Sequence, residues 1–194
     1  YYFNNESRYE VIAFCVDDKF LDEKQFCGLP VVSLKNIEKI YSVNNYLIFV
    51  AVGYSNMRAR KVMYNKIKSL GYSCPNYIHQ SSDISDNVEL GENNAIFKNV
   101  MIEPFVSIGD NNIIWSSSTI CHDVTIENHS FIASQVLIGG NSHLGNNCFL
   151  GFNSTILQNL FIMQESLIAA KALVKTNTQE CTKYLGIPAV NVGT

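Results

Sequence analysis

The chain has 194 residues, of which 16% are charged and 47% hydrophobic, and its formal net charge at pH 7 is −3. This composition gives no basic footprint for nucleic acid, no run of 18 apolar residues that would indicate a membrane span, and no basic-then-apolar signal segment at the start. The six cysteines have no paired spacing, which predicts buried, reduced thiols in a cytoplasmic protein.

Residues 1–77 predict a small α/β domain of Rossmann type, because strand-like and helix-like segments alternate. We expect strands at residues 9–16 and 28–32, and residues 46–52 form an apolar run typical of a parallel strand buried on both faces. A helix is expected from residue 57 to about 70, capped by Ser55 or Asn56. Its expected inward residues are Val62, Ile67 and Leu70, and its expected outward residues are Arg58, Arg60, Lys61, Lys66 and Lys68.

The first five residues, Tyr-Tyr-Phe-Asn-Asn, read like the tail of a helix. A Rossmann-like unit begins with a strand, a glycine-rich loop and a helix, and the first two are not in this sequence. We therefore expect roughly 15–20 further residues before Tyr1 in the natural protein. The sequence of the encoding gene tests this expectation.

From residue 78 onward an aliphatic residue recurs every six positions without interruption, which fits neither an α-helix nor a simple strand meander. A chain that turns a corner every six residues and stacks each coil on the last, a parallel β-helix, fits this period. An ordinary β-sandwich would not hold one register so long. The repeat positions are Ile78, Ile84, Leu90, Ile96, Ile102, Ile108, Ile114, Ile120, Ile126, Ile132, Ile138, Leu144, Leu150, Ile156, Ile162, Ile168 and Val174.

The residues around the repeat support the same architecture. Two positions before each repeat residue lies a second slot, filled mostly by small or β-branched side chains, as a narrow interior requires. Glycine follows the repeat position at five places, where a tight turn leaves little room for a side chain. The ends of a coil stack need caps. We expect the N-terminal domain to cap one end and residues 184–189 to close the other.

This two-part order resembles the bacterial nucleotide-sugar N-acetyltransferases and sialic acid O-acetyltransferases, over nearly the whole chain. The motifs that carry the resemblance are Val-Ala-Val-Gly at 50–53 with Asn56 and Arg58, Tyr-Ile-His at 77–79, Ser-Thr-Ile-Cys-His-Asp at 118–123, Asn-Asn-Cys-Phe-Leu-Gly at 146–151 and Gly-Ile-Pro-Ala at 186–189. The resemblance implies a left-handed β-helix with three hexapeptides per coil, over residues 78–194, and a homotrimer with active sites between subunits.

The candidate for catalysis is His122. It lies two residues after a repeat position and should point out of the coil, and an imidazole suits the removal of a proton from an amine or hydroxyl at neutral pH. Asp123 would fix the ring tautomer and raise its basicity. The resemblance makes His122 the general base, with Asp123 where relatives have Glu. Without the resemblance, a solvated surface histidine would be the simpler interpretation.

The other reactive side chains carry weaker signals. His79 is expected to be structural, and the spacing of His122, His129 and His143 does not place them on one corner, so no metal site is expected. Cys121 could in principle carry an acyl group. The resembled enzymes transfer the acetyl group directly, which makes Cys121 a bystander.

The resemblance also implies where the two substrates bind. Acetyl-CoA would lie in a groove between two β-helices, against Gly139, Gly140, Ala169, Ala170 and Pro188, with Lys171 as either a phosphate contact or a solvated side chain. The nucleotide of the acceptor would lie on the N-terminal domain. Its expected contacts there are Asp17, Asp18, Gly53, Ser55 and Asn56. A plain turn after a strand is the alternative for the Asp pair.

The sequence therefore supports three functions. The first is an acetyl-CoA-dependent acetyltransferase that acts on the amino group of a nucleotide-activated amino sugar in surface-glycan synthesis. The second is a sugar O-acetyltransferase of the sialic acid type, which the sequence does not separate from the first. The third is a non-catalytic hexapeptide scaffold, against which the His122–Asp123 pair argues.

Overall fold

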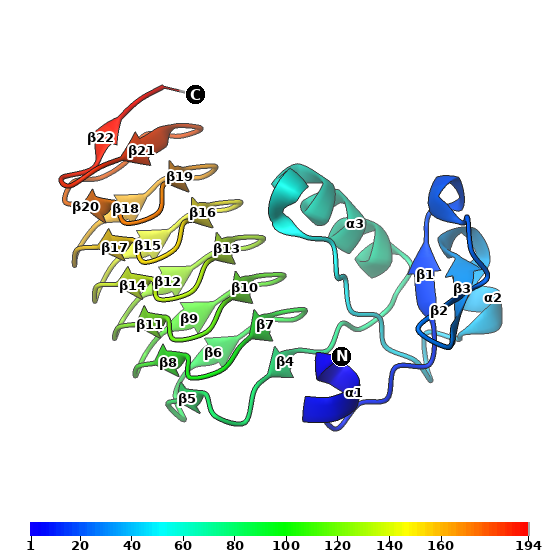
Figure 1. The fold of residues 1–194 in the computed structure, drawn as a ribbon. Coiled ribbons are helices and arrows are strands. Elements are labelled where there is room, and N and C mark those ends of the chain that lie inside the picture. The colour runs from blue at the N-terminus through cyan, green and yellow to red at the C-terminus, as the bar shows by residue number, and fades with distance from the viewer. Residues whose placement is uncertain (194) are drawn as a thin grey trace.

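A computed structural model describes residues 1–193. From Tyr77 onward the chain winds into a stack of coils with three short parallel strands each (Figure 1). As far as residue 156, each of these strands pairs with the strand 18 residues further on, as Ile114 does with Ile132. Three hexapeptides therefore make one coil, and the arrangement fits a left-handed parallel β-helix.

The strands form three sheets, one for each side of the coil. The first sheet contains β4 (Tyr77–Ile78), β7 (Ala95–Ile96), β10 (Ile113–Ile114), β13 (Phe131–Ile132), β16 (Phe149–Leu150), β19 (Leu167–Ile168), β21 (Lys183–Leu185) and β22 (Val190–Asn191). The second contains β5 (Asp83–Ile84), β8 (Met101–Ile102), β11 (Thr119–Ile120), β14 (Leu137–Ile138), β17 (Thr155–Ile156) and β20 (Leu173–Val174). The third contains β6 (Glu89–Leu90), β9 (Ser107–Ile108), β12 (Thr125–Ile126), β15 (His143–Leu144) and β18 (Phe161–Ile162).

The predicted repeat positions build the core of the β-helix. Each strand from β4 to β20 ends on a repeat residue, and from Ile96 to Val174 all of these residues are at most 2% exposed. The first coil differs, because Ile78 is 41% exposed and Ile84 and Leu90 are half-buried. No earlier coil covers these three side chains, so burial through stacking begins only with the second coil.

The corners of the coil depend on a backbone conformation that few residues adopt easily. The third residue after each repeat position from Leu90 to Ile168 has a positive φ, for example 59° at Asn111 and 57° at Asp123. Asparagine fills half of these positions, because its short polar side chain tolerates the left-handed region. Glycine has another role, since a Cβ on Gly139 would lie 2.6 Å from the backbone nitrogen of Gln158 in the next coil.

The N-terminal region is a mixed α/β structure. Helix α1 (Tyr2–Glu6) precedes a three-stranded sheet in which β3 (Leu29–Ser33) is parallel to β1 (Phe14–Val16) and antiparallel to β2 (Gln25–Phe26), and a short helix α2 (Ile37–Ile40) follows. The predicted strand at residues 46–52 does not form. Val50 instead exchanges hydrogen bonds with the side chain of Asn93.

Helix α3 (Met57–Ser69) begins as predicted, with the side chain of Asn56 accepting a hydrogen bond from the Ala59 amide at 2.9 Å. Its inward face was predicted wrongly in two places. Val62 is 66% exposed, whereas Arg60 is fully buried. The helix packs on the polar corner of the β-helix, so the buried face needs a side chain that can donate hydrogen bonds there.

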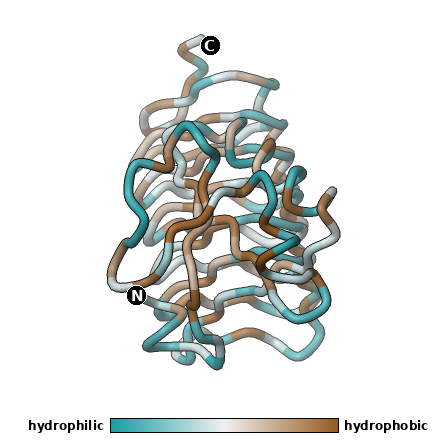
Figure 2. The backbone as a smooth tube through the Cα atoms, turned by 90° about the vertical axis from the view of Figure 1, so that its right-hand side faces the viewer, coloured by the Kyte–Doolittle hydropathy of each residue, from teal (hydrophilic) through white to brown (hydrophobic). Residues whose placement is uncertain are grey.

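The N-terminal region lies beside the coil stack rather than on its end, so the predicted N-terminal cap is wrong (Figures 1 and 2). Its aromatic side chains cover the first sheet instead, where Tyr54 packs on Phe131 and Phe149. At the other end, β21 adds to the first sheet and Tyr184 joins the core, as expected for the closing segment. Within residues 1–193 no helix has the length and apolarity to cross a bilayer.

Candidate active site

The turn between β11 and β12 holds the predicted catalytic pair. We call the edge between the second and third sheets the second corner, and His122 lies there with an exposed side chain. His122 Nδ1 lies 2.8 Å from Asp123 Oδ2. Adjacent residues on a strand point apart, but Asp123 has a φ of 57°, which turns its carboxylate back toward the ring. Because a carboxylate only accepts, Nδ1 carries the proton and Nε2 is the basic nitrogen.

Gly140 makes room for the imidazole of His122. It occupies the same corner one coil later, and a Cβ there would lie 2.8 Å from both Cε1 and Nε2 of the ring. Gly139 and Gly140 are both buried. The structure therefore places Gly140 beside His122, a contact that the sequence did not indicate.

The residues predicted for acetyl-CoA border the second sheet on two opposite edges. Gly139 and Gly140 follow β14 at the second corner, whereas residues 169–171 precede β20 at the edge between the first and second sheets, which we call the first corner. Ala170 and Lys171 are exposed. Pro188 is exposed and lies in the closing segment, next to the backbone bond from Ala189 to Leu173 at 2.7 Å.

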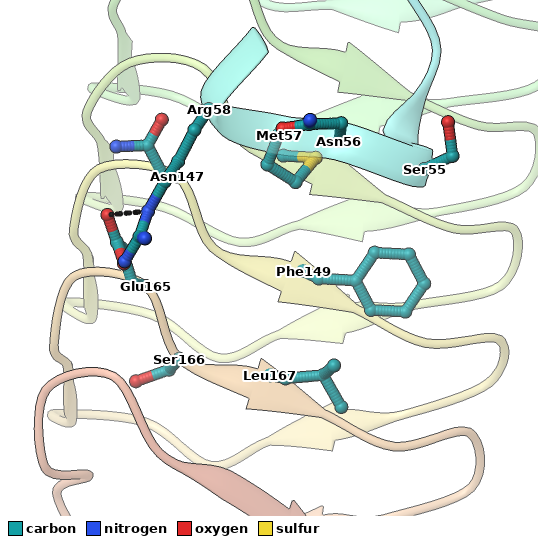
Figure 3. Close-up of a pocket in the computed structure, with 9 residues that line it drawn as sticks. All are labelled: Ser55, Asn56, Met57, Arg58, Asn147, Phe149, Glu165, Ser166 and Leu167. Carbon is teal, nitrogen blue, oxygen red and sulfur yellow. Dashed lines mark hydrogen bonds and ion pairs between the residues drawn. The ribbon is translucent and has the colours of Figure 1, made fainter. Parts of the chain in front are cut away.

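A cavity of about 300 Å³ lies between the start of α3 and the β-helix (Figure 3). It is lined by Ser55, Asn56, Met57, Arg58, Asn147, Phe149, Glu165, Ser166 and Leu167. Arg58 reaches from α3 to Glu165, with Nε 3.2 Å from Oε1. This ion pair lowers the pKa of the Glu165 carboxyl, so the cavity holds both a fixed cation and a fixed anion. We call it the junction cavity.

Only two of the five residues predicted to bind the nucleotide line the junction cavity, namely Ser55 and Asn56. Asp17 instead forms an ion pair with Lys66 at 2.6 Å, and Asp18 accepts a hydrogen bond from Ser33. Lys66 lies ten residues beyond Asn56, which is about 15 Å along a helix. The Asp pair and the start of α3 are therefore separate surfaces in this structure.

The β-helix contributes residues to this junction that the sequence analysis missed. They belong to the edge between the third and first sheets, the third corner, where one residue with positive φ recurs every 18 positions. This corner column consists of Asn93, Asn111, His129, Asn147 and Glu165. The signal was in the sequence, because every member is polar at three times the hexapeptide period.

The corner column holds the N-terminal region through buried hydrogen bonds. Arg60 donates to Asn111 Oδ1 at 2.8 Å and to the Val52 carbonyl at 3.1 Å. Asn93 also donates to Asn111 Oδ1, so the Asn111 amide nitrogen is free to donate to Nδ1 of His129 at 2.9 Å. Burial, with the nearby Lys61 and Arg60, lowers the pKa of His129 to about 4.

The other histidines and the cysteines lie in surroundings that suit structural roles. His79 is buried, 3.3 Å from Glu6, and His143 Nε2 lies 2.9 Å from Glu127. Burial and the nearby Glu103 raise the pKa of the Cys121 thiol, which disfavours the thiolate that a nucleophile needs. Cys27 and Cys181 are exposed, so the prediction that all six cysteines are buried is wrong. In residues 1–193 no cluster of three His, Cys, Asp or Glu side chains could hold a metal.

The sequence of residues 73–182 matches the family model described as the GMPPB C-terminal domain, which is more than half of the chain. The chain belongs to this family. The matched segment begins just before β4 and ends just before β21, so it covers the coils of the β-helix. A search of curated protein sequences found no match.

Several solved structures share the fold. The acetyltransferase domain of PglB from Neisseria gonorrhoeae has a TM-score of 0.82 and 21% identity, covering 95% of this chain and 88% of that one. PerB from Caulobacter crescentus, in complex with CoA and GDP-perosamine, has a TM-score of 0.80 and 26% identity, covering 88% of this chain and 82% of that one. The N-acyltransferase AntD from Bacillus cereus has a TM-score of 0.57 and 15% identity, covering 67% and 87%.

Proposed function

We propose that this protein is an acetyl-CoA-dependent acetyltransferase that acetylates the amino group of a nucleotide-activated amino sugar, in cytoplasmic steps of bacterial surface-glycan synthesis. The single observation that carries the proposal is the contact of 2.8 Å between His122 Nδ1 and Asp123 Oδ2 on an exposed turn. The similarity to PerB, whose structure contains CoA and GDP-perosamine, supports both substrate classes.

The proposed chemistry is direct acetyl transfer. The acceptor amine attacks the carbonyl carbon of the thioester, a C–N bond forms, the C–S bond breaks, and CoA leaves as the thiol. His122 Nε2 takes the proton that the nitrogen loses, and Asp123 stabilises the imidazolium that results. The imidazolium then gives this proton to the departing thiolate of CoA, which restores the neutral base. A general base in this position raises the rate roughly 10²–10⁴-fold.

We infer that the N-terminal region is a Rossmann-like nucleotide-binding domain over residues 1–77, joined to a left-handed β-helix over residues 78–194. The junction cavity supports this proposal, because Ser55 and the first amides of α3 can donate to a diphosphate and Arg58 supplies positive charge. Gly53 precedes this turn. Asp17 and Asp18 would take part only if the Asp17–Lys66 ion pair opened.

We propose further that the active protein is a homotrimer with sites between subunits. In one chain, His122 lies at the second corner, whereas the junction cavity lies against the first sheet and third corner, and none of its lining residues comes from the His122 turn. The second sheet exposes Met101 by 44% and Leu137 by 40%, a surface that a second copy would cover. Acetyl-CoA would lie there, between residues 139–140 of one edge and Ala169, Ala170, Lys171 and Pro188 of another.

The test is CoA release with UDP-, dTDP- and GDP-linked amino sugars, comparing wild type with His122→Ala. We expect kcat to fall about 10²–10⁴-fold while the KM for acetyl-CoA stays nearly constant, because a base acts in the transition state. His143→Ala is the matched control, since His143 also pairs with a carboxylate on the same β-helix. Wild-type kcat/KM for His122→Ala at pH 7 would remove His122 from the mechanism.

The pH dependence of His122→Ala separates the two acceptor classes. An amine loses its proton at high pH without help, so the defect should shrink there. A sugar hydroxyl has a pKa far above the assay range, so the defect of a sialic acid type O-acetyltransferase should persist. A non-catalytic scaffold would release no CoA with any acceptor.

A further inference from the structure

At several corners of the β-helix, including the His122 turn, one main-chain N–H has no main-chain partner. In the His122 turn, the amide of Cys121 bonds to the carbonyl of Ile138 at 3.0 Å, and that of Asp123 bonds to the carbonyl of Pro104 at 3.1 Å. The amide between them, that of His122, has no such carbonyl. At this exposed turn a side chain supplies the acceptor.

At the third corner the acceptor comes from the coil above. The amide of Asp110 bonds to Asn128 Oδ1 at 2.7 Å, and the amide of Asn128 bonds to Asn146 Oδ1 at 3.1 Å. Each acceptor lies 18 residues after its donor. At these turns, an Asx side chain of the next coil therefore accepts the N–H that has no main-chain partner.

The coil after His122 offers no such side-chain acceptor. The residue 18 positions later is Gly140, which has no side chain, and a Cβ there would lie 2.8 Å from the ring of His122. The coil above therefore supplies no side-chain acceptor at this corner, and the acceptor comes from the coil below.

We propose, resting on the proposed function, that Glu103 is the positioning residue of the catalytic base. Its Oε2 accepts the His122 amide at 2.8 Å from the preceding coil. This charge-assisted bond fixes the turn from which Asp123 reaches back to Nδ1. The same carboxylate helps to raise the pKa of Cys121, so the thiol beside the base stays protonated.

The test compares Glu103→Ala with Glu103→Gln. The Gln amide oxygen can still accept the His122 N–H, whereas Ala leaves it unpaired. We expect Glu103→Ala to lower kcat about 10–100-fold with little change in the KM for acetyl-CoA, and Glu103→Gln to stay within about threefold of wild type. Glu89→Ala is the matched control, because it removes an exposed carboxylate from the neighbouring third sheet.

Amide NMR supplies a readout that does not depend on catalysis. The His122 backbone proton should move upfield in Glu103→Ala and by clearly less in Glu103→Gln, because the neutral amide oxygen still accepts the bond but more weakly. Equal losses of kcat in the Ala and Gln variants, or a wild-type kcat in Glu103→Ala, would overturn the proposal. If Glu103→Ala does not fold, a kcat of Glu103→Gln more than about tenfold below wild type would do the same.

The same assay separates this proposal from the function on which it rests. If His122→Ala retains full activity, the base assignment fails, and the amide resonance still tests the hydrogen bond to Glu103. If His122→Ala is inactive while Glu103→Ala is fully active, only the positioning role fails.

Discussion

The geometry of the candidate base comes from single residues at one corner of the β-helix. Asp123 adopts a left-handed conformation and so returns its carboxylate to His122, Glu103 accepts the amide of the turn, and Gly140 leaves room for the ring. Each of these roles depends on the residue type at that position of the hexapeptide. A change at any of these residues should disturb the orientation of the imidazole more than it disturbs the fold.

Gly140→Ala tests this at the residue scale. The new Cβ would meet Cε1 and Nε2 of His122 at 2.8 Å, and a side chain can rotate away. A displacement of about 1 Å in a catalytic group can cost about 10² in rate, so we expect a loss of that order in kcat. Enzyme kinetics measures the loss in kcat, and a thermal melt measures any change in Tm.

Gly139→Ala is the contrasting variant. Its Cβ would meet the backbone nitrogen of Gln158 at 2.6 Å, and backbone cannot rotate away. We expect this variant to lower Tm more than Gly140→Ala does. The opposite order of the two melting temperatures would contradict the packing described here.

His129 makes the stability of the protein sensitive to acid. In the folded chain its Nδ1 accepts from Asn111 and its pKa is lowered to about 4, first by burial. In the unfolded chain a histidine has a pKa of about 6.5 and takes up its proton earlier. The unfolded state binds more protons between these values, so stability should fall by on the order of 3 kcal/mol as the pH falls from about 6.5 to 4.

His129→Asn isolates this contribution. Asparagine suits the φ of 67° at this position and keeps an acceptor for Asn111, but it does not titrate. Urea unfolding at pH 7, 5.5 and 4.5 should show a shallower decline for the variant than for wild type. Parallel curves would mean that His129 does not cause the acid sensitivity.

At the scale of elements, the hexapeptide is the unit that folds. A strand of two residues buries one aliphatic side chain, and its stability comes from the coils before and after it. The cost of removing that side chain should therefore depend on where its coil lies in the stack, although the local sequence is the same.

Ile132→Ala and Ile78→Ala form a matched pair for this prediction. Ile132 is fully buried in the middle of the stack, whereas Ile78 is 41% exposed in the first coil. We expect Ile132→Ala to lower the free energy of unfolding by about 2–5 kcal/mol through lost burial and a cavity. Ile78→Ala should cost on the order of 1 kcal/mol. Chemical denaturation measures both, and equal losses would contradict the stacking model.

At the scale of the whole molecule, the proposed site is incomplete in one chain. The His122 turn and the junction cavity belong to different edges of the coil stack. A trimer would bring the base of one chain toward the cavity or the acetyl-CoA surface of another. Sedimentation should give a trimer, and a monomer with full activity would contradict the proposal.

Mixed assemblies test the shared site directly. His122→Ala removes the base, and Ser55→Trp fills the junction cavity of the other chain. Each variant alone should be nearly inactive, but the two refolded together should regain activity, because some sites combine an intact base with an intact cavity. Mixtures that stay as inactive as the separate variants would place the whole site in one chain.

The sequence by itself determined the β-helix, because each hexapeptide strand pairs with strands 18 positions away and the regular period therefore predicts the stacking. It also singled out His122 and Asp123 as candidates, because their chemistry and their position after a repeat residue are local features. The start of α3 was predictable for the same reason, since Asn56 caps its own helix.

Only the tertiary structure decided how the N-terminal region meets the β-helix. Arg60 is buried because its partner Asn111 lies 51 residues away at a polar corner, and residues 46–52 form no strand because Val50 bonds to Asn93. The placement of the region on the first sheet, rather than on the end of the stack, follows from such contacts. Hydropathy periods record which side of an element is apolar, but they do not record which distant polar group satisfies a buried donor.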